Sequence, residues 1–164
     1  MFSKSQKIII IPVFVLVIAA LVVLTVLRRS RAKSVIADFV PPLHEDNAIA
    51  GEPKDIPDNA AYGNINISDV FSVSMCAFPS LHGNEIDLYY TNKSAADIST
   101  RFIVFDTDGN IIYESGLLNP GEYLKSVALL TIPEDKKAKI KMLSFYPDTW
   151  ESAGSAEATV TFGS

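Results

Sequence analysis

The chain has 164 residues, 14 basic and 19 acidic side chains and one cysteine, with a formal net charge of −5. Residues 1–34 carry six of the basic side chains and no acidic one, so the acidic charge belongs to residues 35–164. This length allows one domain of ordinary size. An acidic body argues against a nucleic-acid groove, which needs clustered lysine and arginine. One cysteine excludes an internal disulfide and any multi-cysteine metal site.

Residues 8–27 form an uncharged apolar run, IIIIPVFVLVIAALVVLTVL. As a helix rising about 1.5 Å per residue, the run spans about 30 Å, the thickness of a bilayer's hydrocarbon core. A cleaved signal peptide has a shorter apolar region and a small-residue cleavage site, whereas this run ends directly at Arg28. Residues 1–34 are therefore predicted to be a single-pass anchor, uncleaved, that binds the lipid bilayer through residues 8–27.

The charges that flank the apolar run bear on its orientation. Lys4, Lys7 and the terminal amine precede it, and four basic residues follow it between Arg28 and Lys33. Under the positive-inside rule this difference of about one charge favours a cytoplasmic body. Alternatively, the arginine cluster contacts anionic headgroups. The flanking charges leave both orientations open.

Residues 35–61 contain four prolines, scattered acidic residues and no sustained period. This composition predicts an extended, semi-rigid spacer that holds a domain away from the membrane. An additional strand at residues 35–40 is the alternative.

From residue 62 onward the sequence indicates β-structure. Apolar and polar residues alternate with the period of half-buried strands, or form short apolar runs, in the segments 65–67, 71–76, 86–90, 101–106, 111–114, 123–131, 138–146 and 156–162. Asp108-Gly109 between two such runs predicts a hairpin, and Asn119-Pro120-Gly121 predicts a turn. Residues 79–84 and 147–154 are predicted to be loops.

Seven or eight short strands without helical periodicity predict an all-β fold over residues 62–164. The expected architecture is a single antiparallel β-sandwich with Greek-key, Ig-like connections, and a barrel is the alternative. Because the chain has one cysteine, the core would depend on aliphatic and aromatic packing.

Residues 85–162 contain three distinctive motifs, Ile112-Tyr113-Glu114-Ser115-Gly116-Leu117, Pro120-Gly121 and Gly154-Ser155-Ala156. With these motifs, the region resembles a group of small membrane-anchored proteins of low-GC Gram-positive bacteria. The sequence departs from that pattern at residues 133–136, where the resembling proteins tend to have a glycine-containing turn. The resemblance implies an extracellular Ig-like β-sandwich behind one N-terminal signal anchor, and therefore an exported domain. It implies no catalytic residues.

No candidate for catalysis, metal binding or cofactor binding stands out. The Asp106–Asn110 segment lacks the glycine and glutamate positions of a calcium loop and is better explained as a hairpin turn. His44 and His82 lie in unlike segments without metal-ligand spacing. Cys76 lies within a predicted strand, where it would pack as a small apolar residue.

The candidate binding residues are the aromatic cluster Phe145, Tyr146 and Trp150, together with His82 in the 79–84 loop. Exposed aromatic side chains bind sugar rings or the apolar anchors of a protein partner. The alternative is that Phe145 or Tyr146 faces the core and that Trp150 caps one end of the sandwich.

These observations favour a non-enzymatic, membrane-anchored cell-surface protein. Its domain would bind a protein partner or take part in an envelope assembly, with the C-terminal domain extracellular. The second hypothesis is a cell-wall carbohydrate-binding module that uses Tyr146 and Trp150. A hydrolase with a dispersed carboxylate pair is a third, which no pattern in the sequence favours. The partner and the oligomeric state stay open.

Overall fold

Ten strands form two sheets within residues 40–163, the part of the chain that the computed structural model describes. These elements belong to the second of two units, residues 1–40 and 41–164, into which the chain divides. Within the described residues, no helix has the length and apolar character needed to cross a membrane. The predicted membrane helix at residues 8–27 lies outside the described residues.

The strands and one 3₁₀ helix follow each other closely along the chain. They are β1 (Ile49–Ala50), η1 (Asp58–Ala60), β2 (Tyr62–Asn66), β3 (Ser72–Cys76), β4 (Ser80–His82), β5 (Glu85–Asn92), β6 (Ser99–Phe105), β7 (Ile111–Glu114), β8 (Glu122–Ala128), β9 (Lys137–Phe145) and β10 (Ser152–Thr161).

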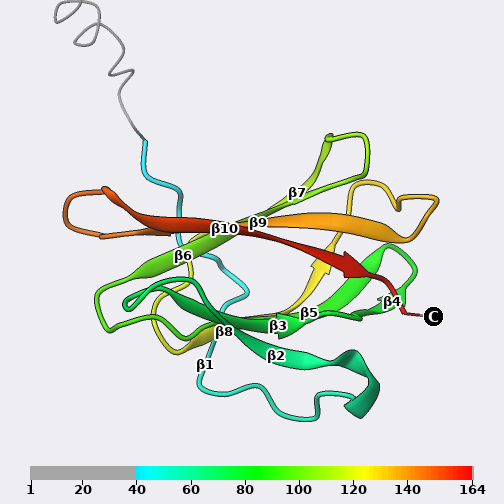
Figure 1. The fold of residues 1–164 in the computed structure, drawn as a ribbon, viewed down its shortest axis with the longest axis horizontal. Helices are drawn as coiled ribbons and strands as arrows, with labels where there is room; N and C mark the ends of the chain where they lie inside the picture. Colours follow the sequence, from blue (N-terminus) through cyan, green and yellow to red (C-terminus); the bar gives the residue numbers. More distant parts are fainter. Residues whose placement is uncertain (1–39, 164) are drawn as a thin grey trace, which may run out of the picture. The chain divides into compact units, whose positions relative to one another are not determined.

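Both sheets are antiparallel, which confirms the all-β prediction. The larger sheet has the strand order β1-β8-β5-β3-β2, with β4 also paired to β5, and the smaller sheet has the order β10-β9-β6-β7. Figure 1 shows them as two layers, with the smaller sheet above the larger one.

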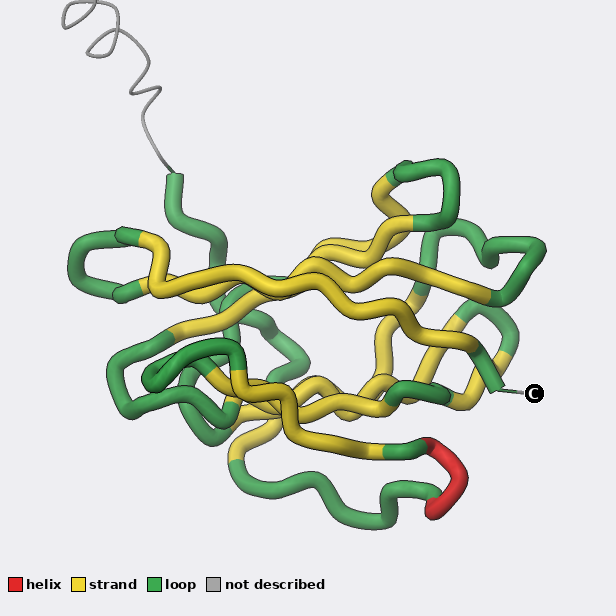
Figure 2. Tube along the Cα trace, viewed as in Figure 1, coloured by secondary structure: helices red, strands yellow, loops and turns green. Residues whose placement is uncertain are grey.

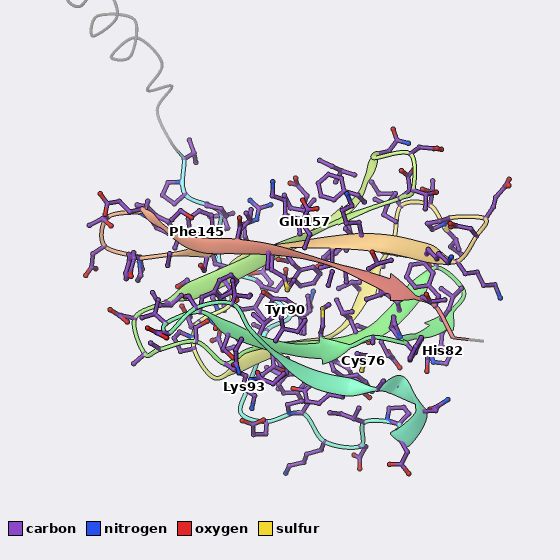
Figure 3. The ribbon with its side chains drawn as sticks, viewed as in Figure 1. Cys76, His82, Tyr90, Lys93, Phe145 and Glu157 are labelled. Atoms are coloured by element: carbon purple, nitrogen blue, oxygen red, sulfur yellow. The ribbon has the colours of Figure 1, made fainter. Side chains whose placement is uncertain are left out.

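One hydrophobic core fills the space between the two layers. Both sheets contribute buried side chains to it, among them Val73, Met75, Ile86, Leu88, Tyr90, Leu124, Phe102, Val104, Ile112, Ala138, Ile140, Met142 and Val160. The Phe102 ring lies 4.4 Å from Tyr90 and 5.6 Å from Tyr113, centroid to centroid, and Figure 3 shows Tyr90 between the layers. The apolar side chains of the alternating segments 71–76, 86–90 and 138–146 therefore point into the core, as predicted.

Two loop predictions are wrong in detail. Residues 80–82 form strand β4, which returns into β5 through Gly83, whose φ of 65° suits glycine. β10 begins at Ser152, because the turn after β9 closes immediately: the Tyr146 carbonyl accepts from the Trp150 N–H at 2.7 Å. The predicted 147–154 loop is therefore shorter, and the β9–β10 hairpin is longer.

The described part of the segment expected to be a spacer packs on the sheets. The Glu45 N–H donates to the Leu117 carbonyl, the Leu117 N–H donates to the Leu43 carbonyl, and β1 pairs with β8. The approach is close at Gly116, where a Cβ would lie 2.7 Å from the Glu45 Cα. Residues 43–50 thus lie along the domain, a pairing that composition alone does not reveal.

A second apolar cluster lies on the outer face of the six-stranded sheet. Tyr89 has a φ of 52° at the bulge in β5, and its buried side chain joins Cys76 and Ala60, with Ile56 and Tyr62 packed against them. The loop that carries these contacts, residues 51–61, is here called the covering segment. Figure 2 shows it on the side of this sheet that faces away from the smaller one.

Candidate functional site

The outer face of the four-stranded sheet carries a row of lysines. Along β9 the buried residues Ala138 and Ile140 alternate with Lys137, Lys139 and Lys141, which point away from the core. Alternation along a strand places residues i, i+2 and i+4 on one face. The three ammonium groups therefore share the surface that faces away from the six-stranded sheet.

The neighbouring strands place unlike side chains on either side of this row. Lys139 pairs in register with Thr159 of β10 on one side and with Phe105 of β6 on the other. Lys141 is similarly placed between Glu157 and Ile103. The lysine row therefore has a polar border on β10 and an apolar border on β6.

The β6–β7 hairpin forms a wall beside this face. The register of the two strands shifts between Val104 and Phe105, and such a bulge bends a strand. Figure 1 shows the β6–β7 turn standing above the four-stranded sheet. Residues of this hairpin, of β9 and of β10 together line a concave surface.

Hydrogen bonds within the turn fix this wall. The two carboxylate oxygens of Asp106 accept from the backbone and side-chain N–H groups of Asn110, each at 2.8 Å. The side-chain hydrogen bond from Asn110 is the main cause that holds the pKa of Asp106 below its ordinary value. Gly109 supplies the positive φ of 88° that the turn requires.

The result is a hollow of about 410 Å³, here called the basic hollow. Its lining comprises Phe105, Asp106, Thr107 and Gly109 from the hairpin, Lys137, Ala138, Lys139 and Lys141 from β9, and Glu157 and Thr159 from β10. Ligand pockets in proteins occupy roughly 300–1,000 Å³, so the basic hollow is large enough to hold part of a ligand or of a partner's chain.

The charge of this face differs from that of the rest of the domain. Residues 40–163 contain eight basic and 18 acidic side chains, and four of the basic ones lie on this face. Arg101 pairs with Glu114 at 3.3 Å, and Lys139 pairs with Glu157 at 3.5 Å. Across residues 40–163, no ion pair includes Lys137 or Lys141.

The predicted aromatic residues gather at the other end of β9. Phe145 ends the strand, and its ring centroid lies 6.5 Å from that of Trp150, with an interplanar angle of 54°. Phe145, Tyr146 and Trp150 are all half-buried. Rings inclined at this angle do not form one flat surface for stacking.

His82 does not join the aromatic cluster. It lies exposed at the end of β4, where its Nε2 is 3.5 Å from a carboxylate oxygen of Asp87. Figure 3 shows His82 and Phe145 at opposite ends of the domain. The four predicted binding residues therefore divide into an aromatic group of three and a separate histidine.

Sequence analysis did not single out the lysines of the basic hollow. The alternation of Lys137, Lys139 and Lys141 with small and apolar residues was a usable signal, because it places all three on one face. Their value as a site depends on the β6–β7 turn, which the strand pattern does not place.

The chemistry available at this face is electrostatic and apolar contact. Among the described residues, no group of three histidine, cysteine, aspartate or glutamate side chains could hold a metal ion. Burial, and to a lesser extent the charge of Asp87, raises the pKa of the Cys76 thiol to about 11, so it stays protonated at neutral pH.

Comparison of the chain with protein-family models, curated proteins and solved structures found no match. The resemblance to small anchored proteins of Gram-positive bacteria thus stays a prediction from the motifs.

Proposed function

We propose that this protein is a non-catalytic binding module, anchored in a membrane by residues 8–27, that holds a protein partner on the outer face of its four-stranded sheet. The observation that carries this proposal is the basic hollow, a concave basic surface on a domain with an excess of acidic side chains. Concave surfaces with a few convergent charges and an apolar border are typical of binding sites.

The domain itself is proposed to be an Ig-like β-sandwich with its C-terminal end outside the cell. The chain passes from the larger sheet at β5 to the smaller one at β6, back at β8 and again at β9, which supports Greek-key connections. The exported location is supported by the resemblance of residues 85–162. An anchor confines the domain to two dimensions and thereby raises its effective concentration toward a partner in the same envelope.

Site-specific photo-crosslinking in the protein's native cells tests the binding function. A benzophenone amino acid replaces Thr159, which is exposed at the basic hollow, or Lys125, which is exposed on β8 of the other sheet. We expect one discrete adduct from position 159 and none from position 125. Equal adducts from both positions, or none from position 159, would contradict the proposal.

Protease treatment of intact cells tests the location. An epitope placed after Ser164 should be lost from whole cells while a cytoplasmic control protein stays intact. Protection of the epitope until the membrane is broken would show that the domain is cytoplasmic, as the flanking charges favour.

A carbohydrate-binding module that uses Tyr146 and Trp150 is the second candidate, supported by the half-buried aromatic side chains at the β9–β10 hairpin. Binding to purified cell wall that is lost on Trp150→Ala, with an unchanged circular dichroism spectrum, would support it. An absence of binding at millimolar sugar would exclude it.

A further inference from the structure

The basic hollow contains two lysines that are not neutralised within the domain. Lys139 is paired with Glu157, but Lys137 and Lys141 have no ion-pair partner within residues 40–163, although that range contains 18 acidic side chains. Surface charges farther apart than about 8 Å are largely screened at physiological salt. An approaching ligand therefore responds to these local ammonium groups more than to the excess negative charge of the whole domain.

The spacing of these lysines fits an extended chain. At about 3.3 Å per residue, Lys137 and Lys141 are about 13 Å apart along β9, with Lys139 midway. An extended peptide repeats its side chains on one side at the same interval of two residues. Acidic side chains at alternate positions would therefore meet all three lysines in turn, whereas a single small anion would meet only one or two.

The border of the basic hollow adds an apolar requirement. Phe105 lines it directly, and Ile111, which pairs with Phe105 in register, leaves 47% of its surface exposed. A strand standing on its edge in the hollow directs alternate side chains to its two sides. One side would face the lysines and the other would face Phe105 and Ile111. A wholly hydrophilic polyanion would leave this apolar border uncovered.

We infer that the partner proposed above binds through an extended acidic segment of its polypeptide chain, in which acidic and apolar side chains alternate. Its carboxylates contact Lys137, Lys139 and Lys141, and its apolar side chains contact Phe105 and Ile111. This inference rests on the proposed function and specifies the chemistry of the partner.

The test measures fluorescence anisotropy of a labelled nonapeptide of alternating glutamate and valine. The full-length protein is kept in a neutral detergent at 150 mM salt. We expect the peptide to bind, and the matched peptide with glutamine in place of glutamate to bind at least about tenfold more weakly.

Charge-reversal variants locate the site. Lys137→Glu with Lys141→Glu should weaken binding of the acidic peptide at least about tenfold. The matched control, Lys54→Glu with Lys125→Glu, changes the net charge equally at two exposed lysines outside the basic hollow, and should change affinity less than about twofold. Equal losses in both variants would overturn the inference, because only net charge would then matter.

The apolar contribution is tested with Ile111→Ser. This variant should weaken the glutamate–valine peptide several-fold and leave the binding of inorganic polyphosphate unchanged. Tighter binding of polyphosphate than of the peptide, insensitive to Ile111→Ser, would assign the basic hollow to a hydrophilic polyanion and overturn the inference.

The crosslinking experiment separates the two proposals. An adduct from position 159 together with no peptide binding would retain the binding function and reject the acidic-segment chemistry. The absence of both would reject the two proposals together.

Discussion

The outer faces of the two sheets differ in whether the chain itself covers them. On the six-stranded sheet, the covering segment packs Ala60 onto Cys76 and Tyr89, so that a patch of sheet surface is buried. On the four-stranded sheet, the outer face carries Lys137, Lys139 and Lys141, which line the basic hollow. A face that the chain itself covers contributes to stability, whereas a face that carries unneutralised charge is available to a partner. The two faces should therefore respond to substitution in opposite ways.

The largest expected effect is at the covered face. Tyr89→Ala removes a side chain that is 3% exposed and leaves a cavity beneath the covering segment. We expect the free energy of unfolding to fall by about 3 kcal/mol, measured by urea denaturation of the full-length protein in neutral detergent. Cys76, the only cysteine of the chain, should also react faster with a thiol reagent. Tyr89→Phe is the control, because it removes only a hydroxyl that donates to the Asp55 carbonyl at 3.4 Å. A thiol that stays equally protected in Tyr89→Ala would show that the covering segment does not depend on Tyr89.

A second substitution should weaken the packing of residues 43–45 against Gly116 and Leu117. In Gly116→Ala the new methyl group would lie 2.7 Å from the Cα and N of Glu45. Backbone atoms cannot yield as a flexible side chain does, so we expect a loss of about 2 kcal/mol and faster proteolysis within residues 41–58. Gly63→Ala is the matched control, because nothing lies within 4 Å of its Cβ position. Equal proteolysis of both variants would contradict this account of Gly116.

Glu122, the first residue of β8, contacts His44 in the same N-terminal segment. Titration of the Glu122 carboxylate makes this contact depend on pH. Its carboxylate accepts from the Asn119 N–H at 2.7 Å and contacts His44 Nε2 at 2.9 Å. Burial raises its pKa, but the hydrogen bonds from Asn119 and His44 outweigh burial and hold the pKa below the ordinary value of 4.5. The stabilisation is therefore complete above about pH 4.5 and is lost as the pH falls through the lowered pKa.

Glu122→Gln should consequently be less stable than the wild type by about 1 kcal/mol at pH 7, with a difference that shrinks toward zero in acid. Urea denaturation between pH 3 and pH 7 measures this difference. Glu134→Gln provides the control, because Glu134 is exposed and no hydrogen bond or ion pair within residues 40–163 includes it. A difference for Glu122→Gln that grows in acid would contradict the assignment.

The smallest effect on stability is expected at the outer face of the four-stranded sheet. Lys137→Gln with Lys141→Gln removes two charges that form no ion pair within the described residues, so the free energy of unfolding should change by less than about 0.5 kcal/mol. A loss above about 1 kcal/mol in urea denaturation would show that these lysines support the fold. A role in the fold, and not the binding of a partner, would then account for these two lysines.

Local sequence pattern was sufficient where a strand's own residues decide its faces. The alternation at 71–76 and 138–146 correctly predicted that Val73, Met75, Ile140 and Met142 would point into the core. Asp108-Gly109 correctly predicted the β6–β7 turn, because few residues other than glycine accept its positive φ. The aromatic cluster of Phe145 and Trp150 was also predictable, since a short turn joins the two residues.

Local sequence pattern was insufficient where pairing with a distant segment decides the structure. Residues 43–50 have the composition of a spacer, yet Glu45 pairs with Leu117 and β1 pairs with β8. The early start of β10 depends on hydrogen bonds around Tyr146 and Trp150. His82, predicted as a binding residue in a loop of its own, lies at the end of the domain opposite Phe145, a distance that no local pattern indicates.

By itself, the sequence determined most of the strands, the inward side of those that alternate and the concentration of basic residues in β9, because these follow from side-chain alternation along one segment. It did not reveal β1 or β4. Only the tertiary structure decided that β9 lies between β6 and β10 and that a bulge lifts the β6–β7 turn beside the lysines. It likewise decided that the covering segment buries a patch of the opposite face. These features depend on pairing between residues far apart in the chain, and no local pattern encodes which distant strands will become neighbours.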